Sequence, residues 1–94
     1  MRIQWTKGAE RNLDQVEEYI AQDNPRAAVN TVLKIIKAVK LLEEQPAMGR
    51  VGRVVDTREL VISGTPYIVP YRVKNDRIQI LRVLHGAMQW PDKL

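Results

Sequence analysis

The sequence predicts an α+β fold in which an N-terminal strand and a two-helix hairpin pack on a small, mostly antiparallel sheet. Apolar residues recur at helical spacing between residues 7 and 45, with one break at Asp23-Asn24-Pro25. Three β-rich segments follow between residues 58 and 85, separated by short turn sequences. At the other end of the chain, Arg2–Trp5 alternates in the manner of a short strand. We therefore expect one domain spanning residues 1–94.

The first predicted helix begins at Lys7, because Thr6 can accept a hydrogen bond from a free backbone N–H of the first turn. It is expected to run to about Ala21. Its apolar residues fall on one face at spacings of four, three and four: Ala9, Leu13, Val16 and Ile20.

The second predicted helix follows after a tight connection, with Asn24 as its cap and Pro25 as its first residue. It is expected to end before Pro46, which steers Gln45 away from helical geometry. Its core stripe is predicted to comprise Ala28, Val32, Ile35, Val39 and Leu42, widened by Val29 and Ile36. The two helices together form an αα-hairpin.

The second half of the chain predicts an antiparallel meander. Its strands are expected at Glu59–Ser63, Tyr67–Val73 and Ile78–His85. Both faces of the last strand are largely apolar, which is typical of a strand in the interior of a sheet. Pro70 has no N–H for the ladder and predicts a bulge or an unpaired side. The loop Pro46–Arg53 contains glycines but lacks the spacing of a phosphate-binding loop.

The charge of the chain is unevenly distributed. The formal net charge is +4, and residues 1–44 contribute nothing to it, with seven Lys/Arg against seven Asp/Glu. Residues 45–94 carry eight Lys/Arg, six of them arginine, against four Asp/Glu. Since arginine suits phosphates and carboxylates, this half predicts an anionic partner, although a solubilising surface is the simpler alternative.

Composition excludes several classes of site and location. The chain has no cysteine and one histidine, so neither a disulfide framework nor a metal site is expected, and no cofactor is predicted. No apolar run approaches the roughly 18 residues that span a bilayer, and the N-terminus lacks an apolar signal core. We therefore expect no membrane partner and a cytoplasmic location.

Metal-free RNA cleavage is the reaction that the remaining residues could support. It needs a proton donor or acceptor, for which His85 is suited, and cations for the developing phosphate charge. The candidate cations are Arg58, Arg72 and Arg82. Simpler structural roles are a hydrogen bond between His85 and the backbone, and an ion pair of Arg82 with Glu59 or another carboxylate.

Five further residues are candidates for partner binding: Arg50, Arg53, Tyr67, Tyr71 and Trp90. Tyrosine rings can stack on a base or donate a proton, but they fill cores more often. Packing of the core or closure of the sheet edge is the alternative for Trp90, and also for Trp5.

Several segments resemble one known family. TREL, PYIVPYRV and RIQILRVLHGAMQWP occur in this order, after IQWTKGAERNLDQVEEYIAQDNPRAA and LLEEQPAMGR. Together they resemble the RelE/ParE superfamily of bacterial type II toxins. The resemblance covers nearly the whole chain and implies a helix hairpin on a small antiparallel sheet.

The resemblance also implies a function. Such a toxin belongs to a plasmid-stabilisation module, and its cognate antitoxin neutralises it, commonly with an acidic C-terminal segment. The toxin–antitoxin complex usually binds operator DNA through the antitoxin. RelE-type relatives cut mRNA on the ribosome, whereas ParE-type relatives poison DNA gyrase.

Two positions favour the ParE-type target. RelE-type members commonly have a basic residue where this chain has Ile68, and many relatives have an arginine where it has Met88. The resemblance thus favours inhibition of gyrase. RelE-like cleavage by His85 with the three arginines is the alternative, and a non-toxic module that binds antitoxin is a further one.

Overall fold

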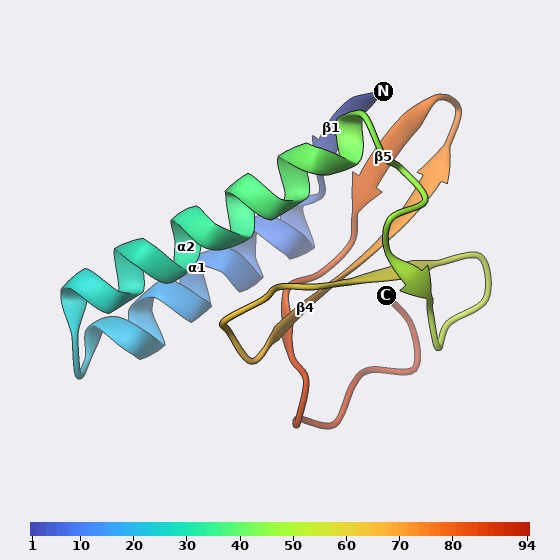
Figure 1. Cartoon of the computed structure of the whole chain (residues 1–94). Coiled ribbons are helices and arrows are strands. Elements are labelled where there is room, and N and C mark those ends of the chain that lie inside the picture. The colour runs from blue at the N-terminus through green and yellow to red at the C-terminus, as the bar shows by residue number, and fades with distance from the viewer.

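Two helices pack on a six-stranded mixed sheet in the computed structural model, which describes residues 1–94 (Figure 1). The helical elements are α1 (Lys7–Ala21), α2 (Pro25–Lys40) and the 3-10 turn η1 (Leu41–Glu43). The strands are β1 (Arg2–Trp5), β2 (Arg50–Val51), β3 (Arg58–Val61), β4 (Tyr67–Lys74), β5 (Arg77–Ile80) and β6 (Leu84–His85). The predicted fold class is confirmed.

The order of strands is β1-β5-β4-β3-β2, and β6 pairs with β4. Every pairing is antiparallel except that of β1 with β5. The N-terminal strand therefore joins one edge of the sheet, and β5 lies in the interior between β1 and β4. No helix of the chain is both long and apolar enough to cross a membrane.

The start of α1 is fixed by Thr6, as the sequence predicts. Its side-chain oxygen accepts a hydrogen bond from the Ala9 N–H at 3.2 Å. The same hydroxyl donates to the Ile80 carbonyl at 2.7 Å, which ties the helix to β5. The predicted bounds of α1 are confirmed.

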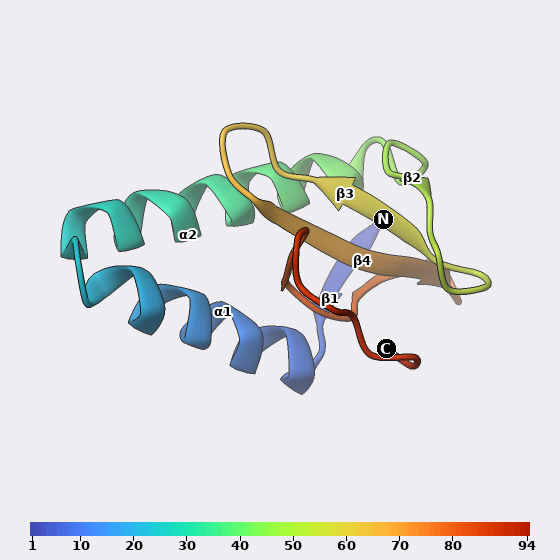
Figure 2. The same cartoon turned by 90° about the horizontal axis from the view of Figure 1, so that it is seen from below.

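The start of α2 is also as predicted, because Asn24 caps it and Pro25 is its first residue. Its end differs from the prediction: the α-helix stops at Lys40, and η1 turns the buried Leu42 into the core. Val29 and Ile36 do not widen the core stripe, since they are 50% and 42% exposed. In Figure 2 the helices are closest at their tight connection, and the sheet lies across their other ends, so the hairpin tip has no third layer over it.

The last predicted strand is interrupted, and Pro70 explains why. The pairs Tyr71↔Ile80 and Ile68↔Leu84 leave three residues of one strand opposite two residues of β4, which is a bulge. The Leu81 N–H donates to the Pro70 carbonyl at 2.9 Å, but Pro70 has no N–H to return the bond. The Leu81 carbonyl instead accepts from Arg82 Nη1 at 3.0 Å, and the Thr6 hydroxyl lies 3.2 Å from it.

The hydrophobic core lies between the helices and one face of the sheet. Thirteen buried residues form it: Ala9, Val16, Ile35, Val39, Leu42, Leu60, Ile62, Tyr67, Val69, Tyr71, Ile78, Ile80 and Val83. Trp5 packs against this cluster. The other face of the sheet, and the edge formed by β2 and the uncovered part of β3, are therefore the surfaces on which polar side chains can act.

Candidate functional site

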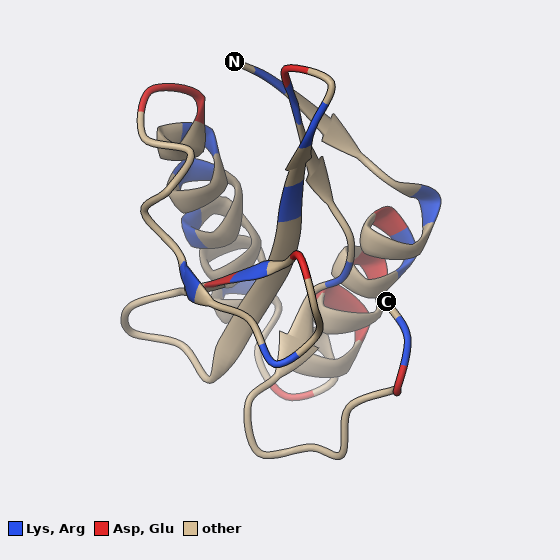
Figure 3. Cartoon of the chain, turned by 90° about the vertical axis from the view of Figure 1, so that its right-hand side faces the viewer, with Lys and Arg blue, Asp and Glu red and all other residues tan.

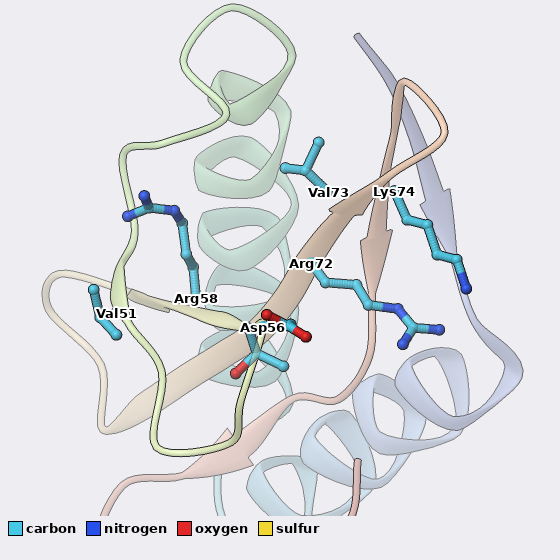
Figure 4. A pocket seen from close by; sticks show the side chains of 7 residues that line it. Val51, Asp56, Arg58, Arg72, Val73 and Lys74 are labelled. Carbon is cyan, nitrogen blue, oxygen red and sulfur yellow. The ribbon is translucent and has the colours of Figure 1, made fainter.

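The four residues considered for catalysis lie in three separate places. Arg58 and Arg72 line a groove of about 660 Å³ together with Val51, Asp56, Thr57, Val73 and Lys74 (Figure 4). Arg58 Nη1 donates to the Gly49 carbonyl at 2.8 Å, and Arg72 Nε donates to Gln79 Oε1 at 2.7 Å. In Figure 4 the two guanidinium groups point away from one another.

His85 lies in a different groove, between α1 and the C-terminal segment. This groove has a volume of about 560 Å³ and is lined by Asn12, Gln15, Val16, Tyr19, Tyr67, Val83, Leu84, His85, Ala87 and Met88. The His85 ring meets Tyr67 edge to face at 5.7 Å, and its Nδ1 accepts from the Ala87 N–H at 3.1 Å. The proton of the neutral imidazole therefore lies on Nε2. His85 thus has the backbone hydrogen bond of the simpler structural role.

Arg82 lines neither the groove of Arg58 and Arg72 nor that of His85, and it forms no salt bridge with a carboxylate. Its guanidinium lies over Gly8, where the missing Cβ makes room for it, and donates to the Leu81 carbonyl. The expected ion pair between Arg82 and Glu59 is wrong, because Glu59 binds two other arginines. The bulge opposite Pro70 interrupts the alternation of side chains between the two faces of the sheet. The position of Arg82 could therefore not be predicted from strand alternation.

Glu59 is the centre of the strongest polar cluster. Its carboxylate accepts from Arg50 Nη2 at 3.0 Å and from Arg53 Nε at 3.1 Å. It also accepts from the Arg53 backbone N–H at 2.8 Å. Burial acts to raise the pKa of Glu59, but these hydrogen bonds and the charge of Arg53 outweigh it and lower the pKa below its ordinary value.

This cluster also holds the C-terminal segment. The Arg53 guanidinium lies 3.5 Å from the centre of a Trp90 ring, which is a cation–π contact. The Trp90 indole N–H donates to the His85 carbonyl at 3.2 Å. The sequence did not single out Glu59 as an organiser. The one available signal was an isolated carboxylate among the apolar residues of its strand.

The five candidate partner-binding residues differ in their exposure. The side chains of Arg50 and Arg53 are 54% and 46% exposed, although both bind Glu59. Trp90 is half-buried. The two tyrosines are buried, and burial raises the pKa of each phenol above its ordinary value.

Tyr71 in particular is a core residue with a structural hydroxyl. That oxygen accepts from the Gly49 N–H at 2.8 Å and donates to the Pro46 carbonyl at 2.8 Å. Tyr71 is 0% exposed, so its side chain offers no surface to a partner in this structure. The hydroxyl fixes the loop Pro46–Arg53 against the sheet.

The sequence did not predict a groove that lies between α2 and β3. It has a volume of about 640 Å³ and is lined by Lys34, Lys37, Ala38, Leu41, Met48, Gly49, Arg50, Glu59, Leu60, Val61, Ile62 and Ser63. Leu41, Met48 and Val61 are 59%, 40% and 51% exposed. The signal that could have indicated it was Leu41, an apolar residue just outside the predicted core stripe.

The β3 edge beside this groove is open. Strand β2 pairs only with Arg58 and Glu59, so it ends before Val61. The Ile62 N–H donates to the Tyr67 carbonyl, and pairing alternates along an antiparallel ladder. The N–H and C=O of Val61 therefore point outward, where another strand could bind them. Nowhere do three His, Cys, Asp or Glu side chains gather to hold a metal ion.

A helix hairpin packed on a small mixed sheet is the architecture expected of a toxin of the RelE/ParE superfamily, and comparison with known proteins agrees. The family model described as the ParE toxin of the type II toxin–antitoxin system parDE matches residues 3–90. The chain belongs to this ParE toxin family.

Two curated relatives match almost end to end. The candidate toxin Y4kP of Sinorhizobium fredii is 50% identical over 93 residues, which are 99% of this chain and 96% of the relative. Toxin RelE2 of Caulobacter vibrioides is 34% identical over 86 residues, which are 92% of this chain and 96% of the relative. Both relatives are named as toxins, and one of them as a RelE toxin.

Solved structures agree with the fold. A chain of the chromosomal ParDE system from P. aeruginosa superposes with a TM-score of 0.82 and 33% identity, covering 90% of this chain and 95% of that one. A chain of the RelBE2 toxin–antitoxin complex from Mycobacterium tuberculosis has a TM-score of 0.62 and 25% identity, covering 89% and 95%.

Proposed function

We propose that this toxin, when free of its antitoxin, inhibits DNA gyrase and does not cleave mRNA. The observation that carries the proposal is the separation of His85 from Arg58 and Arg72, which line different grooves. Metal-free cleavage requires the acid or base and the cations around one phosphate, within hydrogen-bond reach. The match to the ParE family model supports the same target.

The surroundings of Ile68 and Met88, the two positions that favour ParE-type action, are unsuited to the basic residues of RelE-type relatives. Ile68 is buried at 8% exposure, within contact distance of where a Cβ on Gly86 would lie. A basic side chain in its place would need a partner there. Met88 is 66% exposed and lines the His85 groove, which it makes more apolar.

Purified gyrase and a cell-free translation extract test the target directly. We expect the chain to inhibit supercoiling at micromolar excess over gyrase and to leave translation of a reporter mRNA intact. Loss of translation with cleaved mRNA, and unaffected supercoiling, would identify the RelE-like alternative. A chain that fails in both assays, and causes no growth defect when induced alone, would be a non-toxic antitoxin-binding module.

Replacing His85 by alanine provides a second test in cells. Growth arrest on induction without the antitoxin gene is expected to be unchanged, because His85 is not a catalytic residue under this proposal. The colony count and the amount of folded protein are measured together for both chains. A folded His85→Ala chain that no longer arrests growth contradicts the proposal and favours the ribonuclease.

For the cognate antitoxin, we propose the groove between α2 and β3 as a docking site. The outward N–H and C=O of Val61 can pair with an added strand. Leu41 and Met48 offer apolar contacts, and Lys34 and Lys37 suit an acidic segment. The P. aeruginosa and M. tuberculosis neighbours come from toxin–antitoxin systems, which supports a partner of this kind.

Leu41→Asp is expected to weaken antitoxin binding about 10- to 100-fold, because it buries a charge in the centre of the docked surface. Leu41 is 59% exposed, so the free toxin should remain folded. The matched control is Val55→Asp, since Val55 is 84% exposed and does not line the groove. Calorimetric titration with the antitoxin measures both. Equal affinities for the two variants would place the antitoxin elsewhere.

A further inference from the structure

The pairing register gathers basic residues on one face of the sheet. Lys74 pairs with Arg77, which pairs with Arg2, so these three cations form a row across β4, β5 and β1. The next row on the same face consists of Arg72, Gln79 and Gln4. We call this surface the outer basic face: Arg2, Gln4, Arg72, Lys74, Arg77 and Gln79. Figure 3 shows its blue segments close together near the N-terminus.

This face points away from the core. Paired residues share a face, and neighbours along a strand alternate, so the intervening pair Ile3↔Ile78 points to the helices. Ile78 is 0% exposed, whereas Arg2, Arg72, Lys74 and Arg77 are all exposed. The outer basic face is therefore available to a partner that approaches the sheet from the side opposite α1 and α2.

The four cations are not neutralised within the chain. The two salt bridges of the protein both belong to Glu59, and Arg72 binds the neutral side chain of Gln79. Two carboxylates lie near them without forming a salt bridge: that of Asp76, in the turn between Lys74 and Arg77, and that of Asp56, which lines a groove with Arg72 and Lys74. Three strands at the usual spacing place the row Lys74–Arg77–Arg2 across about 10 Å, which is enough to contact neighbouring phosphates.

A phosphodiester backbone fits this face better than a peptide does. Peptides bind sheets at open edges through backbone hydrogen bonds, fill apolar pockets, or bind arginine clusters through acidic side chains. The acidic antitoxin segment is proposed for the α2–β3 groove, which leaves the outer basic face to a different anionic partner. On the outer basic face the partner would meet side chains, and the six that define the face are all cationic or amide. Arginine, lysine and glutamine are residues that contact phosphate oxygens without reading sequence.

The absence of aromatic residues on the face distinguishes duplex from single strands. Proteins that bind single-stranded nucleic acid stack its bases on exposed aromatic rings. The six residues of the outer basic face include none. The nearby Tyr71 is buried on the opposite side, and the half-buried Trp90 has its ring against Arg53. We infer that the outer basic face binds the phosphate backbone of duplex DNA. This deepens the proposed function. It rests on that function for the source of the DNA, because a toxin that binds gyrase would meet the duplex that gyrase holds.

Salt dependence measures this binding. With up to four phosphate contacts, the logarithm of the association constant should fall with the logarithm of salt concentration at a slope of about −3 to −4. Between 50 and 200 mM salt the affinity should therefore drop roughly 100-fold. Fluorescence anisotropy with a labelled 20-base-pair duplex (about two helical turns), and with single-stranded RNA of the same sequence, gives both values for the full chain.

The double variant Arg72→Gln/Lys74→Gln should reduce the magnitude of the slope by about 2 and weaken duplex binding. The control Arg26→Gln/Lys40→Gln removes the same charge from α2, in the other layer and outside the α2–β3 groove, and should bind like the unchanged chain. All four residues are exposed, so circular dichroism should show all chains folded. Equal weakening by the two pairs would overturn the inference, because net charge alone would then account for binding.

Two other outcomes would also overturn the inference: tighter binding to the single-stranded RNA, or no duplex binding at 50 mM salt. The proposed target is tested separately by the supercoiling assay. Duplex binding without gyrase inhibition leaves the inference standing and removes the proposed target. Gyrase inhibition by a chain that does not bind duplex DNA would overturn the inference and leave the proposed target standing.

Discussion

Replacing Glu59 by glutamine is expected to lower the free energy of unfolding by about 2–3 kcal/mol. The carboxylate is 3% exposed and accepts hydrogen bonds from Arg50 and from both the side chain and backbone of Arg53. Glutamine keeps the shape but loses the charge, so two arginines are left without their carboxylate. Their side chains are about half exposed, and solvent limits the loss.

Urea unfolding measured by circular dichroism gives the free energy, and indole fluorescence reports on the C-terminal segment. Trp90 stacks on Arg53, so its emission should change in the folded variant as well. Glu44→Gln is the matched control, because Glu44 is exposed and in neither salt bridge, and it should change stability by less than about 0.5 kcal/mol. Similar losses in both variants would contradict the role of Glu59.

The same carboxylate predicts a pH dependence. Its pKa in the folded chain lies below the ordinary value of 4.5. The stabilisation is therefore complete above that value and is lost as the pH falls through the lowered native pKa. Between about pH 5 and pH 2 the unchanged chain should lose more stability than Glu59→Gln, and the difference between them should shrink. A constant difference over this range would contradict the assignment.

Replacing Gly49 by alanine is expected to cost about 2–4 kcal/mol. The new Cβ would lie 2.6 Å and 2.7 Å from the Tyr71 ring and hydroxyl, and 3.0 Å from the Glu59 carbonyl oxygen. Tyr71 is buried and cannot move aside, and its hydroxyl bond to the Gly49 N–H would be strained or lost. Thermal and urea unfolding measure the effect.

Two variants separate steric strain from the hydrogen bonds. Tyr71→Phe keeps the ring and removes the bonds to Gly49 and Pro46, and should cost about 1–2 kcal/mol. Gly64→Ala, at an exposed turn with φ of +77°, should cost about 1 kcal/mol through the backbone alone. A Gly49→Ala chain no less stable than Gly64→Ala would show that the loop adjusts freely.

Much of the fold could be predicted from the sequence where local rules apply. Thr6, Asn24 and Pro25 mark the helix starts because capping involves residues only a turn apart. Pro70 predicted a break in pairing because its missing N–H is a property of the residue itself. The prediction was wrong about the opposite strand, since Ile78–His85 divides into β5 and β6.

The candidate sites could be predicted far less well. His85, Arg82, Arg58 and Arg72 were grouped by residue type, and the structure distributes them over three places. The α2–β3 groove depends on where β2 ends and on how η1 turns, and neither is a local property. The outer basic face depends on the register of three strands, one of which, β1, is distant in sequence from the other two.

By itself, the sequence determined the α+β class, the starts of both helices and the resemblance to RelE/ParE toxins. Each of these rests on spacing and residue type within short segments. Only the tertiary structure decided that Glu59 binds Arg50 and Arg53 instead of Arg82, and that Arg2, Lys74 and Arg77 share a row. The physical reason is that ion pairs and sheet rows depend on which segments meet. The register and the loops set this, through contacts between residues far apart in the chain.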